Sequence, residues 1–460
     1  MAEVATSFLN YADKKRQALS SKSYRTIIPS AQGGKFSLGQ TVTINLAGNM
    51  SNSFYDFQNS YLMFKVANTH TAKTHRLEGG CGAYSLIRKL EIISNGTTLE
   101  SIDNYNVLVD MMLDQDSSHS WKNNQGKVLM GTGRSKANGR VLDASQKFCL
   151  PLILNCLFNS AKYIPAFSAS QIQIKITFDI ADNCIISPNP TLTADADATT
   201  TPPTAAVYAY DNALDANIEI SEVEFVANVV QLSEDAMGMV DANTGGLYEM
   251  VCDSYRHASS TVTASETSKV VPCGFSFSSL NRVLIAHRSQ KTAHEKAGSV
   301  HIGNRYNPAL VEATFQINGN NTPARAIKGS GTSTSEGSAE ILAELLIADR
   351  ALSVFSHDSS LIGSNMNDGV DTFSLGGGGS TGKDHTNTGT FFIGIDCENV
   401  RANDNDKIFA GQNTIGATTA VALRYGGGAD CVDGVIDIFA QYSSRVVLDM
   451  GGNRTFEVKV

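Results

Sequence analysis

Alternation of apolar and polar side chains with a period of two is the feature that most constrains the fold of this chain. Along residues 172–178, isoleucine and phenylalanine at even positions alternate with glutamine, lysine and threonine at odd positions. The same pattern recurs over 42–46, 311–317 and 421–425. Such a strand places one face on a core and the other in a polar environment, which is typical of antiparallel sheets rather than parallel β–α–β units. The sequence therefore predicts an all-β sandwich or barrel.

Two short helices are expected as insertions into this β framework. Asp103 or Asn104 would cap the first helix, and Ser338 would open the second. Apolar residues recur at helical spacing in both segments and would form the buried stripes. They are Val107, Leu108, Met111 and Met112 in the first helix, and Ile341, Leu342, Leu345 and Leu346 in the second.

The chain reads as two similar halves. The segment 223–230 can be laid over 436–443, and each closes a β-rich half of roughly two hundred residues, the usual size of one sandwich. Each half also carries one helix ahead of its later strands. The similarity at the residue level is weak, so tandem duplication is a hypothesis. We expect an N-terminal arm over 1–30, then two tandem eight-stranded jelly rolls with short inserted helices over 31–235 and 236–460.

Long polar segments interrupt the predicted strands. Residues 187–206 are rich in Pro, Thr, Ala and Asp, while 328–337 and 371–389 are rich in Gly, Ser and Thr. Segments of this composition contribute little to a core, so we expect them to face solvent. The stretch 233–246 is expected to be a polar, glycine-containing connector between the two halves.

Composition, charge and cysteine usage exclude several classes of protein. The chain is 42% hydrophobic and 18% charged, as expected for a globular protein, and its net charge of -9 argues against a protein that mainly grips nucleic acid. The first ten residues lack a signal-peptide pattern, and no stretch approaches the ~20 apolar residues of a membrane span. The cysteines form no CxxC pair, so we expect buried free thiols in a reducing setting, without zinc or disulfides. They are Cys81, Cys149, Cys156, Cys184, Cys252, Cys273, Cys397 and Cys431.

No residue pattern indicates an active site, a metal site or a cofactor site. The stretch 377–383 has the skeleton of a phosphate-binding loop, but Asp384 replaces the hydroxyl residue and a strand-like segment follows, which favours a flexible loop. The nine histidines include no HExxH pattern. Asp396 and Glu398, on one face of a predicted strand, are the best carboxylate pair for glycoside hydrolysis, although a solvated strand edge explains them more simply.

Several segments of the chain resemble one viral protein family in their residues and in their order along the sequence. In the first half they are 59–66, 82–87 followed by 90–96, 103–108, and 150–152 with 157–158 and 163–165, and at the end of the second half 435–447. In this order they resemble the double jelly-roll major capsid proteins of polinton-like viruses and virophages. Each segment is a packing or turn motif and none is a catalytic signature. Residues 299–427 match the family only loosely, so strand boundaries there are left open.

The resemblance implies a structural protein rather than an enzyme. Three copies would form a pseudo-hexagonal capsomer that tiles the icosahedral shell of a double-stranded DNA virus, because two similar domains in three chains give six comparable lateral faces. The implied partners are other copies of the chain, penton proteins and minor capsid proteins, with no small-molecule substrate and no cofactor. The implied location is the virion, assembled inside the host cell without secretion through a signal peptide.

A basic segment before the first predicted strand is the one candidate site. It would lie on the inner side of a shell and bind packaged DNA, an internal membrane or a neighbouring capsomer. A solvated helix flank is the simpler alternative. Its cations are Lys14, Lys15, Arg16, Lys22 and Arg25.

Two other functions are compatible with a β-sandwich chain. A β-sandwich adhesin or spike would recognise a receptor through its loops and would not self-associate laterally. A β-sandwich hydrolase would require a carboxylate pair in a cleft, for which Asp396 and Glu398 are the candidates. Neither alternative explains the ordered segments of the first half.

Overall fold

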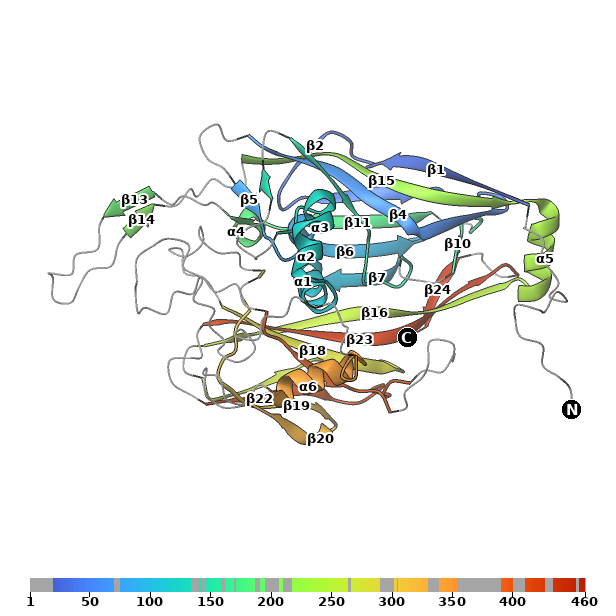
Figure 1. Cartoon of the computed structure of the whole chain (residues 1–460). Helices are drawn as coiled ribbons and strands as arrows, with labels where there is room; N and C mark the ends of the chain where they lie inside the picture. The colour runs from blue at the N-terminus through green and yellow to red at the C-terminus, as the bar shows by residue number, and fades with distance from the viewer. Residues whose placement is uncertain are drawn as a thin grey trace, which may run out of the picture.

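The structure is a computed structural model in which antiparallel sheets dominate and two sandwiches lie one above the other (Figure 1). It describes residues 20–459 except for 70–74, 134–139, 143–144, 159–161, 169–170, 187–190, 195–206, 210–216, 264–265, 290–301, 304, 330–338, 355–358, 360–389, 400–409, 427–432 and 452–454.

The first sandwich, formed by strands between residues 21 and 232, faces one antiparallel sheet with another. The larger sheet has the order β1 (Ser21–Pro29), β15 (Ile218–Leu232), β4 (Ser53–Asn68) and β10 (Ile164–Pro165), with β2 (Lys35–Ser37) on β15 and β9 (Gln146–Leu150) on β4. The facing sheet has the order β3 (Thr41–Leu46), β11 (Ile172–Phe178), β6 (Ile87–Ser94) and β7 (Thr97–Asp103). The short strands β5 (His75–Leu77), β8 (Val141–Leu142) and β12 (Ile185–Ile186) form a separate sheet in the order β12–β5–β8, and β13 (Thr191–Ala194) pairs with β14 (Val207–Ala209).

The second sandwich, formed by strands between residues 247 and 459, repeats this arrangement. One sheet has the order β16 (Leu247–Val262), β23 (Gly434–Asp449), β18 (Leu280–Ser289) and β21 (Ile393–Asp396), with β24 (Phe456–Lys459) on β23. The other has the order β17 (Ser268–Pro272), β22 (Thr419–Tyr425), β19 (Leu310–Ile317) and β20 (Asn320–Lys328).

The two sandwiches share one strand order. In the first sandwich, β1 pairs with β15, β15 with β4, and β3 with β11. In the second, β16 pairs with β23, β23 with β18, and β17 with β22, which is the same connectivity and the one that two interlocked Greek keys require. The segments 223–230 and 436–443, which can be laid over each other in sequence, lie in β15 and β23, the central long strands of equivalent sheets. This equivalence supports tandem duplication, and the proposed boundary at 235/236 falls within a helix that joins the two sandwiches.

The two predicted helices are present, and the described residues also contain helices that were not predicted. The helix α1 (Tyr105–Asp116) follows β7, and α6 (Ala339–Ala348) follows β20, so they occupy equivalent places in the two sandwiches. The shorter helices are η2 (Gly82–Leu86), α2 (His119–Asn123), α3 (Gln125–Leu129) and α4 (Ala181–Cys184). No helix of the described ranges is long and apolar enough to cross a membrane.

The expected polar connector over 233–246 is mostly a helix, α5 (Glu234–Thr244), which stands at one end of the molecule (Figure 1). The Ser233 hydroxyl accepts a hydrogen bond from the Ala236 backbone N–H, and acidic residues occupy the first turn, where the helix dipole favours them. Gly245 ends the helix in the left-handed region, at φ 61°. Local capping therefore outweighs the low hydrophobicity of the segment.

The N-terminal end also differs from the expectation of an arm over 1–30. Residues 21–29 form β1, which pairs along its whole length with β15, from Ser21 opposite Leu232 to Pro29 opposite Glu224. Tyr24, Ile27 and their neighbours are residue types that favour strands, and β15 offers an unpaired edge that binds them. The described fold therefore begins at Ser20, well before residue 31.

The hydrophobic core runs across the junction between the sandwiches. The largest cluster of buried side chains fills the first sandwich and continues onto the face of β16 and β23 through Tyr255, Phe439 and Leu448. A separate cluster fills the interior of the second sandwich. The sheet of β16 and β23 is therefore apolar on both faces, which makes the two sandwiches one packed body.

Candidate functional site

A buried ion network joins α1 to the second sandwich. Asp110 and Asp114 lie one turn apart on α1, and both side chains are almost fully buried. The Arg305 guanidinium, 0% exposed, donates to the Asp114 carboxylate and lies 3.1 Å from Asp110 Oδ2. Lys122 Nζ donates to Asp114 Oδ1 at 2.5 Å, and Arg305 also stacks over the Phe392 ring. These carboxylates and cations face one another inside the junction, as buried charges require.

A second network lies at the start of α1. Asn104 is the N-cap residue of α1, with φ 50°. Its side chain makes no capping hydrogen bond to the helix and donates instead to Asp437 Oδ1 at 3.0 Å. His257 Nε2 lies 2.9 Å from the same oxygen, and Arg288 Nε donates to Asp437 Oδ2 at 2.5 Å. Burial alone would raise the pKa of Asp437, but the Arg288 charge and these hydrogen bonds outweigh it and hold that pKa well below its usual range.

A disulfide forms the third link. Cys156 of the first sandwich and Cys252 of β16 are bonded, with Cα atoms 5.0 Å apart and a sequence separation of 96. The expectation that every cysteine is a free thiol is therefore wrong for this pair, because folding brings together positions that no local spacing connects. The described cysteines outside this disulfide are Cys81, Cys149, Cys184, Cys273 and Cys397.

A buried carboxylate accompanies the disulfide. Glu100 on β7 accepts the Cys156 backbone N–H at 3.0 and 2.9 Å, and the Ser254 hydroxyl of β16 donates to it. Burial raises the pKa of Glu100 to about 7, although the hydrogen bonds from Ser254 and Cys156 oppose that shift. Glu100 thus connects the two sandwiches through a group that titrates near neutral pH.

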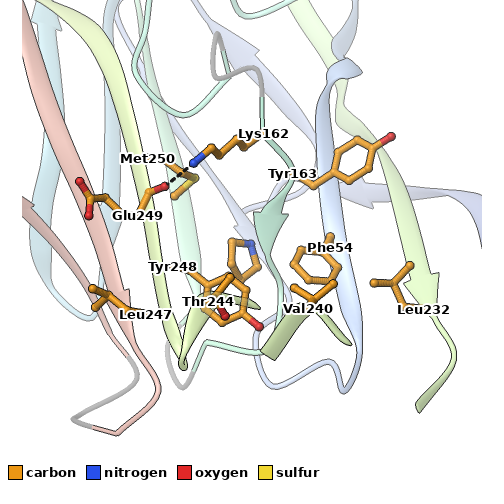
Figure 2. Close-up of a pocket in the computed structure, with 11 residues that line it drawn as sticks. Phe54, Lys162, Tyr163, Leu232, Val240, Thr244, Leu247, Tyr248, Glu249 and Met250 are labelled. Atoms are coloured by element: carbon orange, nitrogen blue, oxygen red, sulfur yellow. Dashed lines mark hydrogen bonds between the residues drawn. The ribbon is translucent and has the colours of Figure 1, made fainter. Parts of the chain in front are cut away.

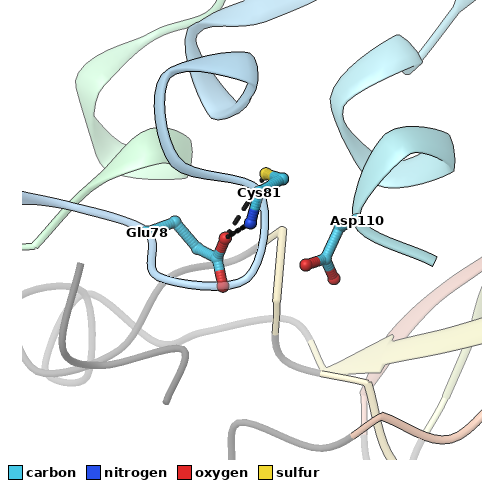
Figure 3. A group of neighbouring side chains, drawn as sticks. All are labelled: Glu78, Cys81 and Asp110. Carbon is cyan, nitrogen blue, oxygen red and sulfur yellow. Dashed lines mark hydrogen bonds between the residues drawn. The ribbon is translucent and has the colours of Figure 1, made fainter. Parts of the chain in front are cut away.

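A small cluster of metal-ligand types adjoins the first network (Figure 3). One donor atom each of Glu78, Cys81 and Asp110 lies within 4.8 Å of the others, and all three residues are buried. The Cys81 backbone N–H and Sγ both donate to Glu78 Oε2, at 2.8 and 3.3 Å. Asp110 meets Arg305, so a protein cation already faces this cluster. The residues therefore belong to the junction and do not indicate a metal centre.

A pocket opens beside α5, at the end of the molecule where the two sandwiches meet (Figure 2). Its volume is about 450 Å³, and its walls come from both sandwiches and from the helix, with mainly apolar side chains. Phe54 and Tyr248 lie against each other in the wall, with ring centroids 6.4 Å apart. At the rim, Lys162 Nζ donates to the Glu249 backbone oxygen at 2.9 Å. A volume of this size is typical of sites that bury an apolar ligand or anchor side chains.

Comparison with known proteins connects this geometry to one architecture. Residues 40–218 match the family model described as the major capsid protein N-terminus. No curated protein sequence matches the chain. The structure resembles PBCV-1 VP54 fitted into a reconstruction of the virophage Sputnik, with 11% identity and a TM-score of 0.59 over 98% of this chain and 99% of that one. The chain is a double jelly-roll protein.

Two further solved structures share the double jelly-roll fold over almost the whole chain. The Faustovirus major capsid protein has 9% identity and a TM-score of 0.56, over 96% of this chain and 92% of that one. A chain of the Sputnik virophage structure has 9% identity and a TM-score of 0.56, over 100% of this chain and 93% of that one. These likenesses establish the fold and confirm the resemblance to double jelly-roll capsid proteins inferred from the sequence.

The structure describes two of the five predicted basic residues. Lys22 and Arg25 lie exposed on β1, at the edge of the first jelly roll. Lys14, Lys15 and Arg16 lie outside the described residues. A shared site for the five cations therefore stays a prediction.

The two carboxylates considered for glycoside hydrolysis, Asp396 and Glu398, are not arranged for it. Glu398 is bound by Arg350, whose Nη2 lies 2.7 Å from each carboxylate oxygen, and its backbone N–H donates to Asp396 Oδ1. Glu398 is thus held by an arginine and Asp396 accepts a backbone hydrogen bond, so the pair lacks the separated acid and base that glycoside hydrolysis uses. The glycine-rich stretch 377–383 lies outside the described part of the chain.

The junction residues were missed at the sequence level. Asp110 and Asp114 sit four apart within an apolar helix, and acids in such a setting are rarely buried unless a cation meets them. That spacing is a usable signal for a buried ion pair. Nothing in the sequence indicates that the cation is Arg305, because the two elements are 191 residues apart.

Proposed function

We propose that this chain is the major capsid protein of a virus and that it builds an icosahedral shell. The observation that carries the proposal is the match of residues 40–218 to the major capsid protein N-terminus, within a chain that folds along its length as a double jelly roll. Capsid proteins of this family are structural, so the function is assembly rather than catalysis.

The proposed assembly unit is a homotrimer with a pseudo-hexagonal outline. Three chains with two jelly rolls each present six comparable units, and a closed ring of this kind does not extend into fibres. The tiling requires that the two jelly rolls keep one relative orientation. The buried ion networks and the Cys156–Cys252 bond supply that rigidity.

Exposed apolar side chains are available to form the proposed lateral contacts between chains. They occur on both jelly rolls, as expected where obligate interfaces on the order of 2,000 Å² or more are to be buried. The most exposed large apolar side chains of the described residues are Val128 (73%), Met239 (62%), Val270 (61%), Ile27 (59%) and Ile415 (59%).

The remaining parts of the proposal concern partners and place. We propose that the jelly rolls expected over 31–235 and 236–460 divide at that boundary, with β1 added to the first. We also propose contacts with penton and minor capsid proteins, and residence in the virion of a double-stranded DNA virus. The N-terminal end would lie on the inner side of the shell, together with its basic residues. They are Lys14, Lys15, Arg16, Lys22 and Arg25.

Light scattering coupled to gel filtration tests the oligomeric part. We expect a mass three times the 49.1 kDa of one chain, constant on dilution. A well-behaved monomer at every concentration would contradict the proposal and favour the adhesin alternative, which needs no lateral self-association.

A further inference from the structure

The pocket beside α5 has the properties of a docking site for apolar side chains. Two of the residues that line it are exposed large apolar side chains, Tyr163 at 53% and Leu247 at 42%. The lining also includes a few polar groups, among them Lys162, which donates to the Glu249 backbone oxygen (Figure 2). A mainly apolar hollow with a few polar groups is the usual form of an interaction site.

The polypeptide enters the fold at the wall of this pocket. The Ser233 backbone N–H donates to the Ser20 oxygen at 2.9 Å, and Ser21 pairs with Leu232. Leu232 itself lines the pocket. The nineteen residues before Ser20 can span up to about 60 Å when extended, so residues 1–19 can reach every part of the pocket in their own chain.

The sequence of residues 1–19 complements the surface around the pocket in two respects. Phe8, Leu9 and Tyr11 form an apolar group followed directly by the cations of 14–16. The helix α5 is acidic and has no Lys or Arg. Its acids are Glu234, Asp235 and Asp241. Apolar anchors beside cations therefore match an apolar pocket beside an acidic helix.

We propose that residues 1–19 dock onto the α5 end of their own chain. Phe8, Leu9 and Tyr11 enter the pocket, and the cations at 14–16 lie along the acidic helix. The own chain is the favoured source because a short tether gives the segment a millimolar effective concentration. This docking would cover the apolar surface at the junction of the jelly rolls, and it stands independently of capsid assembly.

Photo-cross-linking in the full-length chain tests the proposal. Phe8 is replaced by the photoreactive residue p-benzoylphenylalanine, and the cross-linked peptides are identified by mass spectrometry. We expect cross-links to peptides that contain Tyr163, Leu247 or Met250. Leu247→Glu should lower their yield by about tenfold or more, because an unpaired carboxylate in an apolar pocket costs more than a tenfold change in binding. Leu247 is half-exposed, so the variant keeps its fold.

A matched control separates docking from a general effect of added charge. Val270→Glu introduces the same carboxylate at an exposed apolar position of β17, which does not line the pocket, and should leave the cross-links unchanged. An equal mixture of ordinary and ¹⁵N-labelled chains shows whether each cross-link lies within one chain, as we expect. This readout does not depend on trimer formation, so a monomeric protein would leave the docking test intact.

Three results would overturn the proposal. Cross-links between differently labelled chains would show an exchanged segment. Cross-links outside the pocket, or yields insensitive to Leu247→Glu, would show that the pocket is not the binding site. Binding of the full chain to phosphatidylserine vesicles through Phe8, with no pocket cross-links, would show that the segment is a membrane anchor.

Discussion

Replacing Arg305 by methionine should destabilise the junction between the jelly rolls more than any loss of a surface ion pair. The guanidinium is fully buried and meets both Asp110 and Asp114. Methionine keeps apolar bulk over the Phe392 ring but supplies no charge. Asp110 would then lose the guanidinium that faces it, while Lys122 would still pair with Asp114.

The expected loss follows from the burial of these groups. Removing one partner of a buried ion pair typically costs 3–5 kcal/mol, since the remaining charge stays desolvated. For a jelly roll of about two hundred residues, each kcal/mol lowers the melting temperature by roughly 2–4 °C. Arg305→Met should therefore lower Tm by roughly 6–20 °C. Adding Asp110→Asn should recover part of the loss, because it removes the charge of a buried carboxylate that the guanidinium faces.

Differential scanning fluorimetry of the full chain measures this loss. Arg325→Met is the matched control, because Arg325 pairs with Glu340 at 3.1 Å while its side chain is 74% exposed. Exposed pairs contribute at most about 1 kcal/mol, so this variant should shift Tm by a few degrees at most. If Arg305→Met and Arg325→Met shift Tm equally, the buried network does not hold the jelly rolls together.

Three further predictions concern the same junction. Cys156→Ser should remove the bond to Cys252 and cost about 2–5 kcal/mol, since the bond closes a loop of nearly one hundred residues. Because burial raises the pKa of Glu100 to about 7, the folded chain holds a proton that the unfolded chain has lost, and stability should fall as pH rises from about 4.5 to 7. Glu100→Gln should remove up to ~3 kcal/mol of that pH dependence, measured as Tm across the range. Gly80→Ala should destabilise by about 1–3 kcal/mol, because a Cβ there would lie 2.1 Å from Asp110 Oδ1, whereas Gly238→Ala in α5 meets nothing within 4 Å and should stabilise slightly.

Each of these predictions has a result that contradicts it. The Cys156→Ser effect should exceed that of Cys149→Ser, which alters a free, partly exposed thiol, and non-reducing peptide mapping should show the Cys156–Cys252 bond in the parent. A parent whose Tm is flat between pH 4.5 and 7, or a Glu100→Gln variant with the same slope, would contradict the titration of that carboxylate. Equal tolerance of alanine at the two glycines would contradict the close packing of α1 against Gly80.

The strands could be predicted from the sequence because a period of two leaves few other solutions. The alternating residues 172–178 form β11, whose burial alternates as predicted, and 421–425 lie in β22 at the equivalent place of the second sheet. The helix with Met111 and Met112 on its buried stripe was likewise evident from helical spacing. Periodicity is a local property, so it reports which face of an element is buried.

What lies against that face could not be predicted by the same means. Cys156 meets Cys252, and Arg305 meets Asp114, only after two jelly rolls have packed together. The helix α5 was missed because its apolar residues are few, although Ser233 and Gly245 mark its two ends. The pocket beside it depends on both sandwiches, so no single segment of sequence contains it.

Negative-stain electron microscopy of the purified full-length chain tests the central claim most directly. A capsid subunit with two jelly rolls should appear as compact particles with three-fold symmetry and a hexagonal outline, or as closed shells when expressed in cells. Dispersed monomers or elongated rods would contradict assembly into capsomers, even though the double jelly-roll fold would stand.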